Sequence, residues 1–354
     1  MMYLINSDNP YSDWISLDLS FVEINSRQWD LETNLSFSEN WQPLLKGRIK
    51  WGLKGGQLKV TLENGQLLIA SVPQNQDFLI STSTKVDDHI WILNSKTIQE
   101  IKTGDVSFKL GTFIPNAETF NLTATFTPTL ADFSITDAEG LWKHDISPNQ
   151  HGVLERAIAR FLQQNYSSPY ISFVQWGTHT ASFEANRLIL QENLTQLDTL
   201  IEQIYNASSD DLIELAKIAS LNPFIDLRGG NLIATQLSGL SLGNANLYQT
   251  NFRGANLTDI DLSEANLSCA KFSGADLSGA YLGNANLSYA DLHRASLALS
   301  NLIGADLTGA NLLEANLSNA NLSGAKLVDA RFGNNPGLTE AMQEMIKDRG
   351  GHFE

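Results

Sequence analysis

The sequence is poor in cysteine, in basic residues and in long apolar runs. Its single cysteine, Cys269, excludes an intramolecular disulfide and favours a reducing compartment. Only 23 Lys and Arg residues oppose 39 Asp and Glu, and the formal net charge of −16 argues against direct nucleic-acid or anionic-membrane binding. No stretch approaches 18 uninterrupted apolar residues, and the N-terminus lacks a basic region followed by an apolar run. We therefore expect a cytoplasmic protein without a membrane helix or secretory signal.

Tryptophan is missing from the second half of the chain. All seven tryptophans precede residue 180, whereas Leu, Asn, Ala and Gly dominate after residue 225. This change in composition predicts a domain boundary between residues 206 and 225. The expected organisation is a β-rich α+β domain of unknown type over 1–206, a helical N-cap and linker over 207–222, a repeat region over 223–334, and a capping helix and tail over 335–354.

The first part of the chain has the pattern of short strands. Leu58, Val60 and Leu62 alternate with polar residues, Asn64-Gly65 follows, and a second apolar run continues to residue 69. An Asn-Gly pair between such runs predicts a β-hairpin. Further runs indicate strands at 78–82, 90–93, 106–113, 120–126, 133–135 and 170–176. Many short strands joined by polar turns favour an antiparallel sandwich or open barrel.

Helical periodicity predicts four helices in the rest of the chain. Apolar residues recur at three- and four-residue spacing over 151–164 and 193–205. A third helix is expected over 209–221, capped by Ser208 or Ser209, directly before the repeats. A fourth is expected over 339–347. Because an open solenoid end exposes apolar side chains and strand edges, we expect the last two helices to cover the two ends.

A strict five-residue period runs through the second half of the chain. Leu or Phe recurs at every fifth position from Leu227 to Phe332, which makes 22 consecutive occurrences. The residue two positions earlier is alanine in 15 cases, and the residue one position earlier is Asn or Asp in 15 cases. A period of five matches neither a helix nor a flat strand, and such an unbroken repeat indicates a solenoid.

The repeat motif is Ala-(Asp/Asn)-Leu-Ser-Gly, as in residues 275–279 and 320–324. It resembles the pentapeptide-repeat family, and a non-repeat domain ahead of the repeats is typical of its cyanobacterial members. The resemblance implies a right-handed quadrilateral parallel β-helix with four pentads per coil and with the Leu or Phe pointing inward. The expected solenoid core includes Leu247, Phe252, Leu257, Phe272, Leu277, Leu292, Leu307, Leu322 and Phe332. One column contains all the central phenylalanines, so Phe252 and Phe272 are expected to stack.

Twenty residues per coil also distribute the charges among the faces of the rod. Four of the six basic residues of the repeats fall in one column, which predicts a candidate interaction face made of Arg253, Lys271, His293, Arg294 and Arg331. A partner-free solvated surface is the alternative. The faces around Leu277 and Leu282 contain Asp259, Asp261, Glu264 and Asp276 and no base. Tyr289, Leu299, Ile303 and Val328 are among the apolar residues at outward positions, where exposure, a contact with the N-terminal domain or a homodimer seam would explain them.

Signatures of catalysis, cofactors and metals are weak. The glycine-rich segment 52–56 lacks the phosphate-loop spacing and is interpreted as a hairpin bend. His144, Asp145 and His151 lack a third ligand at metal-site spacing, and His179 has no nucleophile motif beside it. Cys269 does not follow a basic helix start, so a reactive thiol is not expected. The tryptophans are expected in the core, with a sugar-binding platform as the alternative. No catalytic, cofactor or metal residue is assigned.

These observations predict a non-enzymatic interaction or scaffold protein whose partner is an unidentified protein. Binding to nucleic acid or to a membrane is not expected, and a homodimer remains an alternative. The family resemblance adds a second hypothesis, a DNA-mimic modulator of DNA gyrase or topoisomerase, although the repeats contain nine acidic and six basic residues. A third hypothesis is a ligand-binding, glycan-binding or catalytic N-terminal domain.

Overall fold

The computed structural model describes residues 2–3, 7–8, 11, 13–69, 78–84, 88–95, 103–117, 119–142, 145–167, 170–176 and 191–354. The chain forms two compact units, Met1–Leu141 with Ala159–Leu194 and Trp142–Ile158 with Thr195–Glu354. Residues 142–158 and 195–206 thus group with the repeats, although composition placed them in the N-terminal domain. No helix of the described residues is long and apolar enough to span a membrane.

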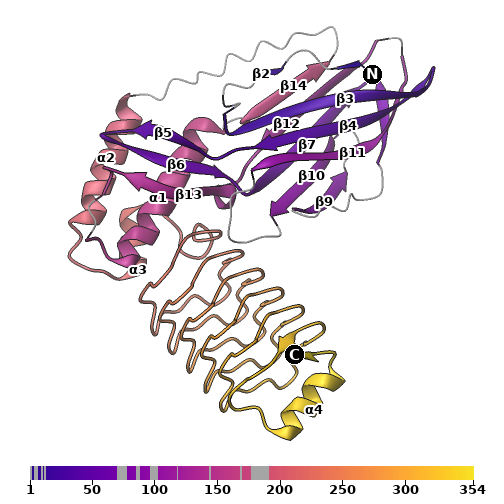
Figure 1. Cartoon of the computed structure of the whole chain (residues 1–354). Helices are drawn as coiled ribbons and strands as arrows, with labels where there is room; N and C mark the ends of the chain where they lie inside the picture. The colour runs from indigo at the N-terminus through magenta and orange to yellow at the C-terminus, as the bar shows by residue number, and fades with distance from the viewer. Residues whose placement is uncertain are drawn as a thin grey trace. The chain divides into compact units, whose positions relative to one another are not determined.

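The first unit contains three antiparallel sheets, which confirms the β-rich N-terminal domain (Figure 1). The five-stranded sheet has the order β1 (Met2–Tyr3), β3 (Ile15–Asn25), β4 (Gln28–Phe37), β11 (Gly104–Pro115), β8 (Gly65–Ile69). The six-stranded sheet has the order β2 (Ser7–Asp8), β14 (Ser172–Trp176), β12 (Asn121–Thr127), β7 (Gly55–Glu63), β10 (Asp88–Ser95), β9 (Phe78–Thr84). The third consists of β13 (Phe133–Glu139), β6 (Gly47–Leu53) and β5 (Asn40–Leu44), with a short 3₁₀ turn at Leu130–Asp132 before β13.

Alternating apolar side chains form the core of these sheets. Ile15, Leu17, Leu19 and Phe21 are buried along β3, while the residues between them are more exposed. Such alternation places one face of the strand against the core. Trp51 and Trp91 are fully buried, and the other described tryptophans are half-buried.

The expected hairpin at Asn64-Gly65 is wrong. Strand β7 pairs with β10 and β12, whereas β8 pairs with β11 in the other sheet. Asn64 has a φ of 61°, so the turn is tight, but it carries the chain from one sheet to the next. The glycine-rich segment is likewise not a hairpin bend, because β6 and β7 belong to different sheets. A Cβ on Gly55 would lie 2.1 Å from the Leu93 carbonyl oxygen, so close strand packing requires glycine there.

Three helices precede the repeats along the chain, with strand β14 between the first and the second. They are α1 (Pro148–Tyr166), α2 (Gln191–Tyr205) and α3 (Leu212–Ile218). Helix α3 is shorter than expected, and its N-cap is Asp211 rather than Ser208 or Ser209. The Asp211 carboxylate accepts hydrogen bonds from the backbone N–H groups of Ile213 and Glu214, which satisfies donors at the helix start.

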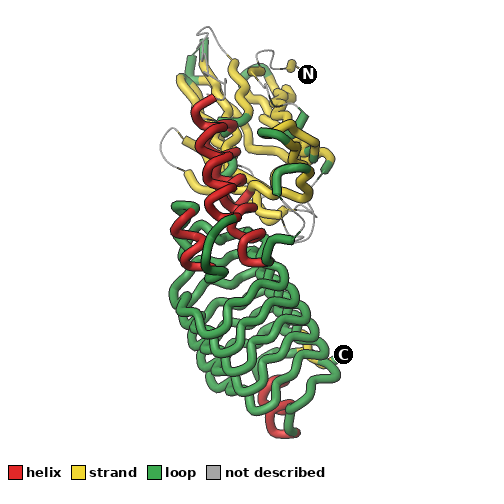
Figure 2. The backbone as a smooth tube through the Cα atoms, turned by 90° about the vertical axis from the view of Figure 1, so that its left-hand side faces the viewer, coloured by secondary structure: helices red, strands yellow, loops and turns green. Residues whose placement is uncertain are grey.

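The repeat region is a stack of twenty-residue coils held by parallel bridges. Residue i pairs with residue i+20 from Asn231↔Asn251 to Asn311↔Arg331. The Leu277 N–H donates to the Ser296 carbonyl at 2.8 Å, and the Ser296 N–H donates to the Ala275 carbonyl at 2.9 Å. Because each bridge involves a single residue, the coils are drawn as loop and turn in Figure 2. This ladder is that of a β-solenoid built from pentads.

The C-terminal residues continue this ladder and add a helix. Strand β15 (Arg331–Phe332) pairs in parallel with β16 (His352–Phe353). Between them lies α4 (Glu340–Asp348), whose N-cap Thr339 accepts a hydrogen bond from the Met342 N–H. The helix follows the last coil in Figure 1. Its bounds agree with the predicted helix within one residue.

Candidate functional site

The interior of the rod is filled by the five-residue series. All 22 central Leu and Phe side chains from Leu227 to Phe332, including the nine named as solenoid core, are at most 2% exposed. The Phe252 and Phe272 rings lie 5.1 Å apart with an interplanar angle of 7°, which confirms the predicted stacking. Where Thr or Ser replaces the inward alanine, as at Thr235 and Ser300, its hydroxyl donates to the backbone carbonyl of the central leucine in the preceding pentad.

The frequent Asn or Asp before each central residue forms a turn. The Oδ1 of Asp276 accepts the Ser278 N–H at 3.0 Å, and that of Asn286 accepts the Ser288 N–H at 3.0 Å. These are Asx turns, in which the side chain replaces a backbone acceptor. Sequence reasoning recorded the bias without this explanation. The carboxylate of an Asp at this position therefore stabilises the turn through a backbone hydrogen bond.

The predicted basic face is only partly accessible. Lys271 is 3% exposed, so its expected outward exposure is wrong. Arg253 is half-buried on the next coil toward the N-terminus. Each pentad contributes similar backbone geometry, so the motif alone does not distinguish a buried outward position from an exposed one.

The exposed members of that face have acidic or carbonyl partners. Arg294 Nε lies 2.8 Å from Glu314 Oε2, and Arg331 Nε lies 2.6 Å from Glu354 Oε1. His293 Nδ1 lies 3.0 Å from the Leu313 carbonyl oxygen. The hydrogen bond from Arg294 lowers the pKa of the Glu314 carboxyl. The charge of this column is thus largely compensated, although the face itself stays a prediction.

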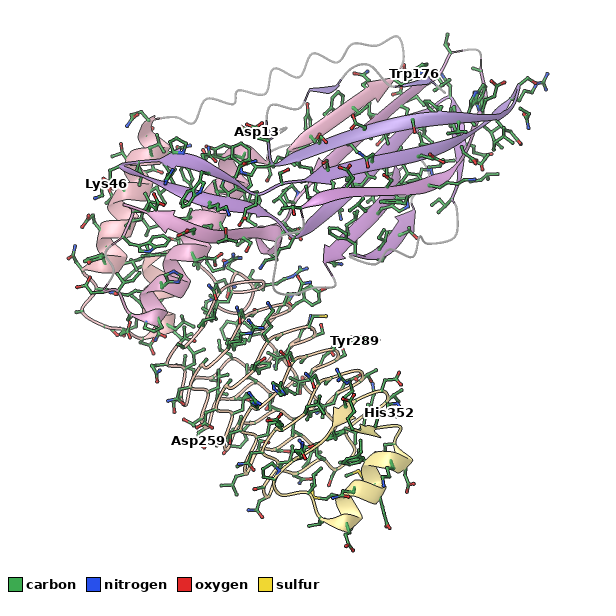
Figure 3. The ribbon with its side chains drawn as sticks, in the orientation of Figure 1. Asp13, Lys46, Trp176, Asp259, Tyr289 and His352 are labelled. Carbon is green, nitrogen blue, oxygen red and sulfur yellow. The ribbon has the colours of Figure 1, made fainter. Side chains whose placement is uncertain are left out.

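Exposed apolar and acidic side chains gather on another part of the rod. Tyr281, Leu299 and Ile303 are 54%, 68% and 45% exposed. Asp259 and Glu264, one coil toward the N-terminus, are also exposed. In Figure 3, Asp259 lies at the edge of the rod opposite Tyr289 and His352. The sequence analysis noted Leu299, Ile303 and the acidic residues but not Tyr281, and it did not join them into one surface.

Helix α1 closes the first coil with polar side chains. Asn149 Oδ1 accepts the Gln236 N–H at 2.9 Å, and its Nδ2 donates to the Gln236 carbonyl at 3.1 Å. Arg156 is fully buried, lies 2.6 Å from the Glu155 carboxylate, and donates to the Arg228 carbonyl. A Cβ on Gly152 would lie 2.6 Å from Leu232 Cδ2, so this glycine permits close helix packing. The sequence predicted a cap at this end from 209–221, which stays a prediction, and did not predict these contacts of α1.

The outer edge of the last coil is covered by C-terminal residues, which also form hydrogen bonds with its backbone carbonyl groups. Arg349 Nη1 donates to the Leu322 and Ala325 carbonyls at 3.2 Å each. Ile346 of α4 is fully buried, and the Phe353 ring lies 5.6 Å from Phe332. Hydrogen bonds and apolar cover therefore protect the edge that the last coil would otherwise expose.

The residues that the sequence analysis weighed as catalytic or metal-binding candidates make structural contacts wherever the structure describes them. Burial raises the pKa of the Cys269 thiol, which disfavours the reactive thiolate. His151 packs edge-on against Trp142 at 5.4 Å, and Asp145 accepts a hydrogen bond from Tyr205. Within the described ranges no group of three or more His, Cys, Asp or Glu residues is placed to hold a metal ion. His144 and His179 lie outside the described residues.

The comparison with protein families concerns the repeats. A protein-family model described as pentapeptide repeats (8 copies) matches residues 231–268, 265–302 and 300–334. The chain is a pentapeptide-repeat protein. This confirms the predicted family for the repeat region. No curated protein matches the chain.

Solved pentapeptide-repeat structures are also similar to part of this pentapeptide-repeat protein. One from the cyanobacterium Cyanothece 51142 is 28% identical over 30% of this chain and 90% of its own, with a TM-score of 0.27. One from the cyanobacterium Nostoc PCC 7120 is 33% identical over 32% of this chain and 84% of its own, with a TM-score of 0.15. QnrB1, a plasmid-mediated fluoroquinolone resistance protein, is 19% identical over 34% of this chain and 80% of its own, with a TM-score of 0.20.

Proposed function

We propose that this protein is a non-enzymatic scaffold for protein–protein interaction. The observation that supports the proposal is the exposure of large apolar side chains at outward positions of the rod, such as Tyr281 and Leu299. The coil does not need a large apolar residue there, because the inward series already fills its interior. Large side chains exposed together mark interaction surfaces more often than they serve the fold.

The fold supports this role through rigidity. Parallel bridges fix each coil to its neighbours, so outward side chains keep fixed spacings along the rod. We further propose that the coils form the right-handed quadrilateral β-helix of the family, with α3 and α4 as helical caps. The four pentads in each twenty-residue coil support this finer description.

The test is a pull-down from native lysate with the full chain as bait. We expect specific protein partners that survive washing at physiological salt, and no turnover in substrate screens. A supercoiling assay with DNA gyrase separates the scaffold from a DNA mimic. Inhibition or protection of gyrase by the purified chain, with no protein partner recovered, would replace the scaffold proposal.

Glycan or ligand binding by the first unit is a second candidate, supported by one aromatic cluster. The Phe120 and Trp176 rings are stacked at 6.3 Å with an interplanar angle of 12°, and both are half-buried. Partly exposed aromatic rings suit apolar or sugar ligands. Tryptophan fluorescence titrations with a glycan panel test it, because binding at this cluster should quench the Trp176 emission.

A further inference from the structure

Three exposed apolar side chains form one patch on adjacent coils. Tyr281 pairs by a parallel bridge with Asn301. Leu299 and Ile303 lie two positions before and after Asn301 in sequence. Neighbouring coils are about 4.8 Å apart, so the three side chains lie on one continuous part of the surface. Each is at least 45% exposed.

Leu299 occupies a backbone conformation that leucine rarely adopts. Its φ is 62°, and the equivalent positions of other coils are occupied by Gly239, Asp259, Gly279 and Asn319. Glycine, asparagine and aspartate tolerate this region, whereas a bulky residue there is an outlier. Since Leu299 is 68% exposed, its side chain contributes little packing in return. Tyr289 and Arg294, at the same position of their own pentads, have a φ of 58° each, so this conformation belongs to the pentad turn, and the exposure of Leu299 is what marks the patch.

Acidic side chains lie on the preceding coil beside this patch. Asp261 pairs by a parallel bridge with Tyr281. The Asp259 carboxylate lies over Gly279, with an oxygen 2.2 Å from the Cβ that an alanine would have, and so extends toward Leu299. Among the described residues no basic side chain pairs with Asp259, Asp261 or Glu264. The exposed carboxylates of Asp259 and Glu264 are therefore available to a partner, while Asp261 also accepts the Ser263 N–H in an Asx turn.

We propose that this surface, called the Leu299 face and made of Tyr281, Leu299, Ile303, Asp259, Asp261 and Glu264, binds a protein segment with basic side chains beside apolar ones. The proposal rests on the scaffold function and names its partner chemistry. Charge complementarity selects a cationic segment, and the apolar centre excludes water from the contact. A second copy of the chain does not fit, because it has a net charge of −16 and its exposed Arg294 and Arg331 are paired.

The test measures binding of a labelled amphipathic peptide, leucines on one face and lysines and arginines on the other, by fluorescence anisotropy with the full chain. The apolar variant is Y281S/L299N/I303S, and the charge variant is D259N/D261N/E264Q. The matched control is Y289S/V328S, which removes exposed apolar side chains on another face, where Asp306 is paired with Lys326. Circular dichroism and melting establish that each variant is folded.

We expect the Kd to rise about tenfold or more in both Leu299-face variants and less than about twofold in the control. A peptide with serines in place of leucines should bind at least about tenfold more weakly than the parent. No peptide binding, or equal weakening in all three variants, would overturn the proposal. If lysate partners are recovered equally by the wild type and both face variants, the scaffold function stands and this face does not. If neither recovers a partner, the scaffold function itself fails.

Discussion

Inward and outward positions differ sharply within a single pentad. Leu277 is fully buried, whereas Ser278 is half-exposed and hydrogen-bonds with Ser296 of the next coil. We expect Leu277→Lys to prevent soluble expression, because a buried ammonium without a partner is costly. Leu277→Ala should lower the free energy of unfolding by about 2–5 kcal/mol. Denaturant unfolding of purified variants measures this, and Ser278→Lys is the control; equal stability of the two lysine variants would contradict the inward assignment.

Two basic residues of the same column should differ in how strongly charge reversal destabilises the fold. Lys271 is 3% exposed, whereas the Arg294 side chain is 66% exposed in its pair with Glu314. Lys271→Glu should lower the melting temperature by several degrees, because it places an acid where a buried base was accommodated. Arg294→Glu should change it little, because exposed ion pairs contribute little. The melting temperatures of the two variants test this prediction. An unchanged melting temperature for Lys271→Glu would mean that the Lys271 side chain is not buried in solution.

One amide side chain makes two of the hydrogen bonds between helix α1 and the first coil. Asn149 binds both the N–H and the carbonyl of Gln236. Asn149→Ala leaves these groups without their partner, and we expect the free energy of unfolding to fall by about 1–3 kcal/mol. Gln164→Ala, at an exposed position of the same helix, is the matched control. Urea unfolding distinguishes them; a loss no larger than that of the control would show that the Asn149 hydrogen bonds add nothing measurable to stability.

The C-terminal element should keep the rod monodisperse. A chain that ends at Asn334 loses α4, β16 and the Arg349 contacts to the Leu322 and Ala325 carbonyls. The exposed edge can then pair with another chain. Light scattering should show oligomers or aggregates that the full chain does not form. A monodisperse truncated protein with unchanged melting would show that these residues are dispensable.

At the scale of secondary-structure elements, the sequence predicted the periodic repeats better than it predicted which strands pair with each other. The five-residue series placed Leu247 and Leu322 in the core because one period determines every coil. Asn64-Gly65 predicted a turn but not the sheets that it connects, since a hairpin and an inter-sheet turn share the same local signal. The cap formed by Asn149 joins residues 87 positions apart, and no local pattern encodes such a distance.

The sequence also could not show which charges of the predicted basic face are paired or buried, because this depends on contacts between distant residues. The column of Arg294 and Arg331 looked basic because composition counts charges and omits partners, and Glu354 lies in the tail outside the repeats. Burial of Lys271 likewise cannot be inferred from the motif, which gives every pentad the same outward positions. The Leu299 face could not be predicted from the motif either, because it depends on the exposure of Tyr281, Leu299 and Ile303 in the folded rod.

The whole molecule carries two separate reporters of unfolding. Six of the seven tryptophans belong to the first unit, whereas Cys269 belongs to the second. With Trp142→Phe, fluorescence should follow the first unit and thiol labelling the second. We expect slow labelling in the native state, because burial raises the pKa of the thiol, and transitions at different denaturant concentrations. Coincident transitions would instead indicate one cooperative unit.

The parallel pairing of residue i with residue i+20 makes the rod adjustable in length. Inserting twenty residues of matching motif adds one coil, moves everything beyond it by about 4.8 Å, and leaves each side chain facing its former direction. Inserting five residues instead displaces all later pentads by a quarter of a coil, so that every downstream face changes its neighbour. The number of four-pentad coils therefore determines the distance between two surface residues along the rod, and the number of single pentads determines the direction in which each residue faces.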